Sequence, residues 1–238
     1  MKSIKILHII SAVLTILLKA SAGVTGFSSS SPIPPPPPIS VPVWSFATTS
    51  QTKTSMNIMT FCIPVSVSSP KLWALSFYYG TLTKDSFLGC EKHDKNNDDN
   101  QSKTSKGILQ LLKFHHRHLV PILGKKSGRD VDKATLCSKE GFPWSKDPDC
   151  NFEVLPGCAL YIEVECQNSE NLMDAGDHVV AICQVTRVGV WEQTDGNELK
   201  DGKIRWLDGG IDANPIPLGA IDESNALYSG QLRKEGIL

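Results

Sequence analysis

The first 84 of the 238 residues contain no Asp and no Glu. The whole chain has a formal net charge of -1, so it lacks the clustered basic excess of most nucleic-acid-binding proteins, and no nucleic-acid partner is expected. Charged residues make up 21% and hydrophobic residues 40% of the sequence, which excludes a wholly disordered or collagen-like chain. Residues 85–238 carry 18 basic and 25 acidic side chains, so we expect the acid-free front and the remainder to have different roles.

The front segment also lacks an apolar run long enough to span a bilayer. The run from Ile6 to Leu18 has thirteen residues, whereas a spanning helix needs roughly 20. Lys2 and Lys5 precede this run, and the small residues of Ala20-Ser21-Ala22 follow it. This order predicts a cleaved signal peptide over residues 1–22, with an uncleaved anchor as the alternative. The mature protein is therefore expected to have no membrane partner.

Residues 23–55 are rich in Ser, Thr and Pro, and the five consecutive prolines at 34–38 can only form an extended polyproline segment. Behind a signal peptide, with Phe27 near the junction, such a segment resembles the two-part presequences that direct proteins into plastids bounded by extra membranes. We therefore predict a plastid location, with secretion and a plain linker as the alternative. Residues 23–55 are expected to be disordered, and the folded domain is expected over residues 56–238.

The seven cysteines include no C-x-x-C pair and no histidine at metal-ligand spacing, so we expect no metal site. Their odd number and their positions inside apolar runs favour a reducing compartment. Apolar residues at helical spacing predict an amphipathic helix over residues 107–120. His115, His116 and His118 lie on this helix without a third ligand nearby, so we interpret them as solvated surface.

Regular alternation of strands and helices is also missing, which argues against a doubly wound parallel sheet. Strands are predicted for four runs rich in aromatic and β-branched residues, at 61–65, 72–79, 154–166 and 178–190. Two polar stretches without apolar anchors, at 91–106 and about 193–220, are predicted to be loops. These patterns predict a mainly β, mainly antiparallel barrel with one or two helices.

Four polar segments could carry chemistry: residues 64–70, 80–84, 124–133 and 174–178. Hydroxyl groups, a lysine and turn N–H groups, such as those expected over residues 64–70 and 80–84, can form a cradle for a phosphate group. Residues 124–133 contain four cations and two Asp, which fits either a phosphate-facing loop or a solvated helix cap. Residues 174–178 place His178 beside an Asp at a strand end, where either a β-turn or an acid–base group is consistent with the sequence.

In their order along the chain, these segments resemble the flavin reductase-like family, the FMN-binding split barrel, and most closely a branch found in photosynthetic organisms. The resemblance covers about residues 57–238. It rests on PVSVSSPKLWALSFYYGTLTKDSFL (64–88), GILQLL (107–112), LGKKSGRDVDK (123–133), FEVLPGCALYIEVE (152–165), DAGDHVVAICQV (174–185) and LYSGQLRKEGIL (227–238). It implies a six-stranded antiparallel Greek-key split barrel with one or two peripheral helices, and a homodimer with FMN in a groove lined by both subunits.

The resemblance also implies roles for individual residues. The backbone along the flavin ring is expected from Pro64, Val65 and Ser66, and contacts to the ribityl phosphate from Thr81, Thr83 and Lys84, completed by Ser127, Gly128 and Lys133. His178 is expected as the catalytic residue, near the face where a nicotinamide would stack, and Tyr228 where the C-terminal segment closes over the site. The usual TxNS-type motif of the best-known reductases is replaced by residues 60–66, TFCIPVS, which bears on NAD(P)H use more than on FMN binding.

The function implied by the resemblance is an FMN-binding oxidoreductase that passes hydride from NAD(P)H to flavin, with flavin and nicotinamide nucleotides as ligands. Two other classes stay open because a fold does not determine a function. One is a non-enzymatic flavin or tetrapyrrole binder, and the other is an FMN-free dimeric interaction protein. A flavin absorption spectrum of the purified protein would separate the flavin binders from the last class, and NAD(P)H consumption would then identify the enzyme.

Overall fold

The computed structural model describes residues 39–50, 53–66, 68–89, 105–149, 152–166, 172–193, 202–207 and 225–238. The predicted signal peptide, the polyproline run and most of both predicted polar loops lie outside these residues, and those interpretations stay predictions. One compact unit extends over Ile39–Leu238. Within the described part of the chain, no helix combines the length and the apolar character needed to cross a membrane.

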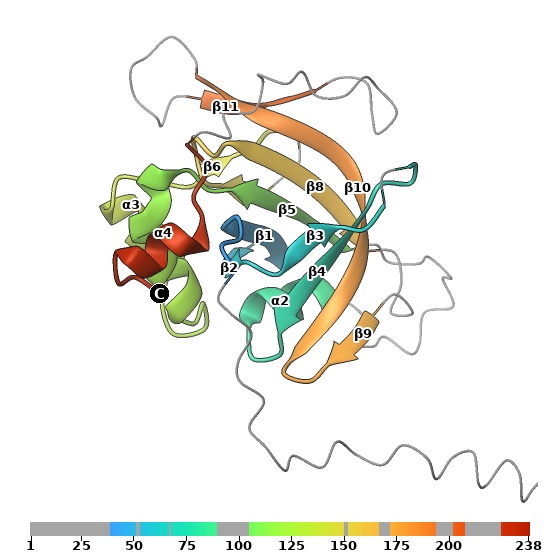
Figure 1. Ribbon diagram of the computed structural model, residues 1–238. Coiled ribbons are helices and arrows are strands. Elements are labelled where there is room, and N and C mark those ends of the chain that lie inside the picture. The colour runs from blue at the N-terminus through green and yellow to red at the C-terminus, as the bar shows by residue number, and fades with distance from the viewer. Residues whose placement is uncertain are drawn as a thin grey trace, which may run out of the picture. The chain divides into compact units, whose positions relative to one another are not determined.

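A curled antiparallel sheet forms the body of this unit (Figure 1). Its strands follow the order β2-β1-β5-β8-β10-β4-β3, and two further strands, β9 and β11, pair with β10. The strands of the main path are β1 (Trp44–Ser50), β2 (Lys53–Met59), β3 (Cys62–Pro64), β4 (Leu72–Tyr78), β5 (Ser105–Leu111), β8 (Leu160–Cys166) and β10 (His178–Gln193). The remaining strands are β9 (Leu172–Ala175), β11 (Gly202–Trp206) and a separate pair, β6 (Ser145–Lys146) with β7 (Glu153–Val154). The prediction of a mainly β, antiparallel split barrel is confirmed, although the sheet has nine strands instead of six.

Among the residues that the structure describes, the helices are few and short. They are α2 (Leu82–Leu88), α3 (Lys133–Lys139), α4 (Ser229–Lys234), the 3₁₀ helix η3 (Phe114–Leu119) and the π-helix η4 (Pro121–Lys125). Helix α2 inserts Phe87 into the curl of the sheet, where its ring centroid lies 5.0 Å from that of Phe46 and 5.3 Å from that of Phe77. Edge-to-face and tilted contacts of this kind add to the stabilisation from buried area.

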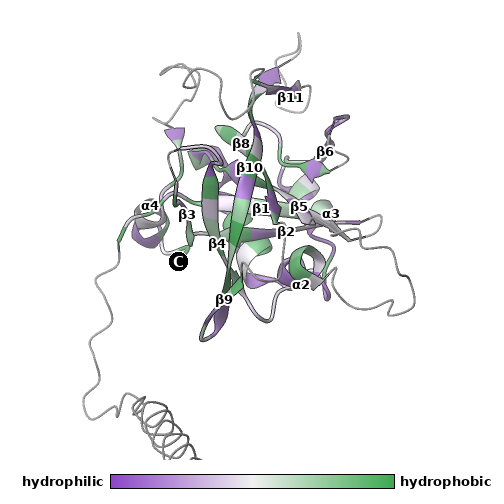
Figure 2. Cartoon of the chain, turned by 90° about the vertical axis from the view of Figure 1, so that its right-hand side faces the viewer, coloured by the Kyte–Doolittle hydropathy of each residue, from purple (hydrophilic) through white to green (hydrophobic). Residues whose placement is uncertain are grey.

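Two hydrophobic cores lie on opposite faces of the sheet, because side chains alternate along each strand. Strand β1 sends Trp44 and Phe46 into the core inside the curl, and Ala47 into the core under the helices. Strand β10 shows the same alternation of buried and half-buried residues over its first half, and much of β4 and β10 is hydrophobic in Figure 2. A sheet that is buried on both faces positions the loops at its ends firmly.

The boundary predicted between linker and domain at residue 55 is wrong. Strand β1 and the first half of β2 lie in the segment assigned to a disordered linker, and β1 is an internal strand between β2 and β5. The alternation of Trp44 and Phe46 with smaller residues is a strand pattern. The neighbouring prolines and the absence of acidic residues led instead to the prediction of a linker. The folded domain begins near Ile39.

The helix predicted over residues 107–120 is also wrong, since β5 occupies its first half and η3 its second. Strand β5 is buried on both faces, so Leu109 and Leu111 enter one core while Ile108 and Leu112 enter the other. A run that is apolar on both faces has no period-2 signal, and its spacing then imitates that of a helix.

His116, interpreted as solvated surface, is fully buried. Its Nδ1 accepts the N–H of Lys113 at 3.1 Å, so its Nε2 donates to the carbonyl of Pro156 at 3.0 Å. Burial lowers the pKa of His116 to about 3. This neutral imidazole ties η3 to the turn before β8 and is a structural residue.

The predicted loop at 193–220 needs a similar correction. Strand β11 lies inside it and pairs with the end of β10, from Gly189 opposite Trp206 to Gln193 opposite Gly202. The other loop, predicted over residues 91–106, ends earlier than expected, because Ser105 and Lys106 begin β5. Apart from Gln193 and Leu207, the remaining residues of both stretches lie outside the described part of the chain.

Candidate functional site

Three segments that are far apart in the sequence surround one hollow of about 190 Å³, called here the α2 hollow. Strand β2 contributes Ser55 and Asn57, and the turn into α2 contributes residues 80–83. The end of η4 and the residues after it contribute 124–128, together with Lys133 at the start of α3. The hollow lies at one end of the sheet, where β4 leads into α2. Because its lining includes main-chain groups, the hydroxyls of Ser55, Thr83 and Ser127 and the ammonium of Lys133, it is suited to an anion.

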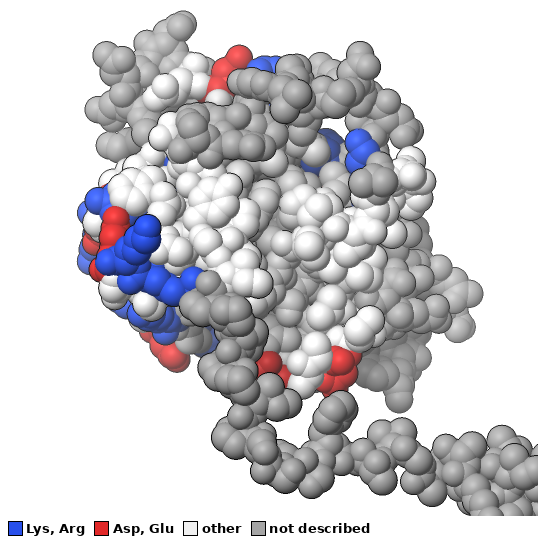
Figure 3. All heavy atoms as spheres, in the orientation of Figure 1, with Lys and Arg blue, Asp and Glu red and all other residues white. Residues whose placement is uncertain are grey.

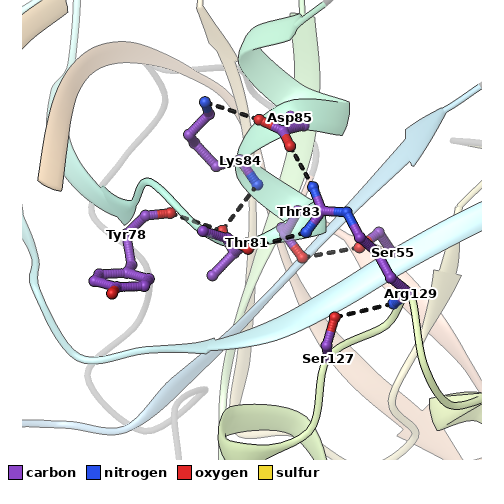
Figure 4. A network of polar contacts seen from close by, with 9 residues as sticks. Ser55, Tyr78, Thr81, Thr83, Lys84, Asp85, Ser127 and Arg129 are labelled. Carbon is purple, nitrogen blue, oxygen red and sulfur yellow. Dashed lines mark hydrogen bonds and ion pairs between the residues drawn. The ribbon is translucent and has the colours of Figure 1, made fainter. Parts of the chain in front are cut away.

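A polar network holds these segments together (Figure 4). Thr81 caps α2: its Oγ1 accepts the N–H of Lys84 at 3.2 Å and donates to the carbonyl of Tyr78 at 3.0 Å. The Thr83 hydroxyl lies 2.9 Å from that of Ser55, which joins α2 to β2. The α2 side of the hollow is therefore anchored to both neighbouring strands.

Arg129 closes the same network from the opposite side (Figure 4). Its guanidinium donates to the carbonyl of Gly80 at 2.9 Å and forms an ion pair with Asp85. Its main-chain N–H donates to the Ser127 hydroxyl at 3.2 Å. This clamp fixes the segment of residues 127–129 against α2 and sets the width of the hollow between them.

Lys133 supplies a buried positive charge in the wall of the α2 hollow. Its Nζ donates to the carbonyl of Leu123 at 2.6 Å and to that of Met56 at 3.1 Å. None of the ion pairs among the described residues includes Lys133, and burial lowers the pKa of its ammonium group to about 8. An ammonium with three N–H donors and two carbonyl acceptors retains one donor for a ligand.

Gly128 lets the loop approach this lysine. A Cβ at this position would lie 3.3 Å from Leu82 Cδ2 and 4.0 Å from Lys133 Cε. A side chain at residue 128 would therefore press on Leu82 and narrow the shared wall of the hollow.

A second hollow, of about 140 Å³, adjoins the first and is called here the His178 hollow. It shares Asn57, Tyr78, Thr81 and Thr83 with the α2 hollow and continues past Thr60, Phe61 and His178. Its lining is more aromatic, since the rings of Phe61 and Tyr78 meet the imidazole of His178 edge to face at 5.9 and 5.5 Å. The two hollows form a groove with a polar end and an aromatic end.

His178 is oriented by its neighbour at the start of β10. Its Nδ1 lies 2.6 Å from Asp177 Oδ1. Since a carboxylate only accepts, Nδ1 carries the proton and Nε2 is the nitrogen left for a ligand. The turn before the strand therefore presents an imidazole of defined tautomer at the aromatic end of the groove.

Six of the predicted site residues come together in this groove. Thr81, Thr83, Ser127, Gly128 and Lys133 line the α2 hollow, and His178 lines the adjoining one. The structure therefore brings segments 81–84 and 124–133 to the same hollow. In the sequence, only the family resemblance had linked these two segments. The form of the cradle differs from a tight turn, because Thr81 is the N-cap of α2 and Lys133 belongs to α3.

The other predicted site residues lie outside the lining of both hollows. The side chain of Lys84 forms an ion pair with Asp85 at 2.8 Å. Pro64 pairs with Trp73 at the opposite end of β4, and Val65 follows it with an exposed side chain. Ser66 Oγ closes the turn to β4 by donating to the carbonyl of Pro70 at 2.7 Å and accepting the N–H of Leu72.

Tyr228 is the last predicted site residue that the groove does not include. It pairs with Pro42 in an isolated β-bridge and caps α4 at its N-terminus. Its position next to the chain entry into β1 gives it a role in anchoring the C-terminal segment.

Sequence reasoning missed the residues of β2 that face the groove. Ser55 and Asn57 alternate with the core residues Met56 and Ile58, so a period-2 strand pattern with one polar face was present. Thr60 and Phe61 then occupy the position along the groove that had been assigned to residues 64–66. Arg129 gave no signal of its role, because its partners, Asp85 and Gly80, are more than forty residues away.

Comparison with known proteins agrees with this architecture. The sequence model of the "Flavin reductase like domain" matches residues 41–208, and none of the curated protein sequences matches the chain. An FMN-binding protein from Thermus thermophilus with bound 1-cyclohex-2-enone superposes with a TM-score of 0.51 at 18% identity, over 68% of this chain and 78% of that one. A flavoredoxin from Methanosarcina acetivorans gives a TM-score of 0.49 at 12% identity, over 76% of this chain and 90% of that one.

The likeness to the Thermus thermophilus protein shows the fold, and the family match spans every strand of the main sheet, from β1 to β11. It covers well over half of the chain, including all residues of both hollows. The chain belongs to the flavin reductase-like domain family.

Proposed function

We propose that this protein binds FMN in the groove, with the phosphate in the α2 hollow and the flavin ring toward the His178 hollow, and that it passes hydride from NAD(P)H to the flavin. The observation that carries the proposal is the buried ammonium of Lys133, which has two carbonyl acceptors in the wall of a hydroxyl-lined hollow. Burying a charge costs free energy, and a bound phosphate would offset this cost.

The donor set fits a phosphate monoester. Lys133 would donate its third N–H, the hydroxyl groups of Ser127 and Thr83 lie on opposite walls, and Lys126 adds an exposed cation at the rim. Hydrogen bonds from charged donors to phosphate oxygens are about twice as strong as neutral ones. The Arg129–Asp85 clamp would hold the two walls at a constant separation.

The aromatic end of the groove fits a planar ring system. Phe61 and Tyr78 are more than half exposed and flank His178. Bound flavin supplies the hydride-accepting chemistry, and the protein supplies position and electrostatics. His178 would hold its proton on Nδ1 against Asp177 and present Nε2 to the ligand, while the aromatic side chains would exclude water from one side.

The test is a titration of FMN and riboflavin into the full-length chain and into Lys133→Met. Losing one charged hydrogen bond costs about 1.5–3 kcal/mol, so FMN affinity should fall roughly 10- to 100-fold. Riboflavin has no phosphate, and its affinity should change less than about twofold. Lys84→Met is the matched control, because the Lys84 side chain faces Asp85 outside the groove, and it should leave both affinities unchanged.

Equal losses for FMN and riboflavin in Lys133→Met would contradict the phosphate assignment. Retention of FMN affinity in that variant would contradict it as well. Hydride transfer is then tested by following NADH and NADPH absorbance with FMN present, in wild type and in His178→Ala. NAD(P)H oxidation by the wild-type protein supports the reductase, whereas FMN binding without NAD(P)H oxidation identifies a flavin-binding protein without this activity.

We also propose that the chain forms a two-fold homodimer through the face of β3. Phe61, Ile63 and Val65 alternate along this edge segment and are 66%, 60% and 51% exposed. Figure 3 shows that charged side chains lie mainly at the margins of the face over β3 and β4. Exposed apolar patches of this kind mark interaction surfaces. Sedimentation should give a dimer at micromolar concentration and a monomer for Ile63→Lys; a monomeric wild type would contradict the proposal.

A further inference from the structure

Two cysteines face each other across neighbouring strands of the sheet. Strands β8 and β10 lie side by side and pair in antiparallel register, with Gln184 opposite Glu165 (Figure 1). Continuing this register by one residue places Cys183 opposite Cys166. Both side chains enter the core inside the curl, where Cys183 is fully buried and Cys166 is 6% exposed. The two thiols therefore lie on the same face of adjacent strands.

The main-chain hydrogen bonds show which kind of cross-strand pair this is. The N–H of Val185 donates to the carbonyl of Lys71 at 2.9 Å, on the side of β4 and away from β8. Main-chain groups point to alternate neighbours from one residue to the next, so those of Cys183 also point toward β4. Cys166 and Cys183 thus form a pair without main-chain hydrogen bonds between them, in which opposed Cα atoms lie about 4.5 Å apart.

This spacing permits a disulfide. Disulfides connect cysteines whose Cα atoms lie about 4.4–6.8 Å apart, and opposed Cβ atoms are closest in pairs without mutual main-chain hydrogen bonds. The thiol of Cys183 is hydrogen-bonded to that of Cys166, so the two side chains already point toward each other. A bond between the sulfur atoms therefore requires no rearrangement of the strands.

The other described cysteines are placed differently. Cys62 lies on β3, and β4 separates it from β10, which puts it beyond the reach of a disulfide to Cys183. Cys137 and Cys158 belong to the core on the opposite face of the sheet. Within the described part of the chain, Cys166 is thus the cysteine that Cys183 can reach.

We propose that Cys166 and Cys183 are a modification site that closes to a stabilising intrachain disulfide as the protein folds. The bridge would close a loop of sixteen intervening residues, which includes β9 and His178. It would tie the end of β8 to the strand that presents His178 and would restrict the unfolded chain. The predicted signal peptide would lead the chain through a disulfide-permissive compartment, in contrast to the reducing compartment that the odd number of cysteines favours.

The oxidant would be a small disulfide of the glutathione type. The thiolate of Cys166 attacks one sulfur of this molecule and displaces a thiolate, which leaves a mixed disulfide on Cys166. The thiolate of Cys183 then attacks Cys166 Sγ and displaces the second thiolate. The two cysteines lose two electrons and two protons in total, and the small disulfide becomes two thiols.

The reactivity of the thiols determines when the bridge can form. The hydrogen bond with Cys166 and burial both raise the pKa of the Cys183 thiol. Because the thiolate is the reactive form, the folded and reduced protein should exchange slowly with a small disulfide. The bridge is therefore expected to form while the core is still open.

The experiment refolds the reduced full-length chain in a mixture of reduced and oxidised glutathione, traps free thiols with iodoacetamide and maps the peptides by mass spectrometry. The expected product links Cys166 to Cys183 and persists in about a tenfold excess of reduced over oxidised glutathione. The oxidised protein should melt about 5–10 °C above the protein refolded with a reducing phosphine.

Cys166→Ala and Cys183→Ala should each remove this difference in melting temperature between the two redox conditions. Cys158→Ala is the matched control, because Cys158 is buried in the other core, and it should keep both the link and the difference. The peptide map of wild type requires no variant, so it tests the proposal even where an alanine in the core prevents folding.

Recovery of Cys166 and Cys183 in alkylated form after oxidative refolding would overturn the proposal. A link from either of them to another cysteine, or equal melting temperatures under the two redox conditions, would overturn the stabilising bridge as well.

Discussion

Replacing Lys133 by Met is expected to stabilise the free protein at neutral pH while it weakens FMN binding. Burial lowers the pKa of the Lys133 ammonium to about 8, from an ordinary value of 10.5. Between these two pH values the unfolded chain holds more protons than the folded one, so the free energy of unfolding of wild type rises with pH in this window. Below pH 8 the folded protein bears the full cost of the buried charge.

The size of the effect follows from the same two values. The difference between about 8 and 10.5 corresponds to about 3 kcal/mol at 1.36 kcal/mol per pKa unit. Screening by solvent from the groove and the loss of two hydrogen bonds to the carbonyls of Met56 and Leu123 reduce the expected gain for Lys133→Met to about 1–2 kcal/mol.

Urea unfolding of wild type and Lys133→Met at pH 7 and pH 9.5 measures this gain. The gain should shrink to less than half at pH 9.5, where the wild-type lysine is largely neutral in the folded state. Lys84→Met, at an ion pair on the surface, should change stability by less than about 1 kcal/mol. If Lys133→Met is less stable than wild type at pH 7, or if its gain is the same at both pH values, the carbonyl bonds outweigh the cost of burial and the reasoning fails.

Three further predictions concern the fold around the groove. Burial lowers the pKa of His116 to about 3 in the folded state, below the ordinary 6.5. The free energy of unfolding should therefore fall by up to about 1.4 kcal/mol per pH unit as the pH decreases from 6.5 toward 3. Melting curves of wild type measured across this range should show the slope, and His116→Gln should flatten it. Gly107→Ala should destabilise by about 1–3 kcal/mol in urea, since its Cβ would lie 2.2 Å from Phe46 Cζ. Arg129→Met should alter stability by less than about 1 kcal/mol yet weaken FMN binding several-fold in the titration, because the clamp to Gly80 and Asp85 is lost; unchanged FMN binding would contradict the role of the clamp.

Local patterns in the sequence determined the class of the fold. The alternation along β10 and the aromatic run of β4 predict strands because one face of each strand is more deeply buried than the other. The absence of regular strand–helix alternation then left an antiparallel sheet as the remaining arrangement. The family resemblance came from the same segments, and the match over residues 41–208 confirms it.

Local sequence patterns gave the wrong secondary structure for a strand buried on both faces and for a strand next to a proline-rich segment. Strand β5 was predicted to be helical because both of its faces are apolar. When the residues on both faces of a strand are buried, polar and apolar residues do not alternate, so the two-residue period of a strand cannot be recognised in the sequence. Strand β1 was taken for a linker because it follows a polyproline run, although its long-range pairing with β5 makes it an internal strand.

The candidate site divides in the same way. The sequence was sufficient to name Thr83, Ser127, Lys133 and His178 as polar residues in turns or near strand ends. Only the tertiary structure decided that Ser55 and Asn57 complete their groove and that Lys84 and Tyr228 do not take part. Which hydroxyl or ammonium groups face a common hollow depends on the pairing of β1, β2, β4 and β10 across more than a hundred residues, and such contacts leave no local period in the chain. The burial that lowers the pKa of Lys133 has the same origin, since its two acceptors, Met56 and Leu123, are brought to it by the packing of η4 and β2.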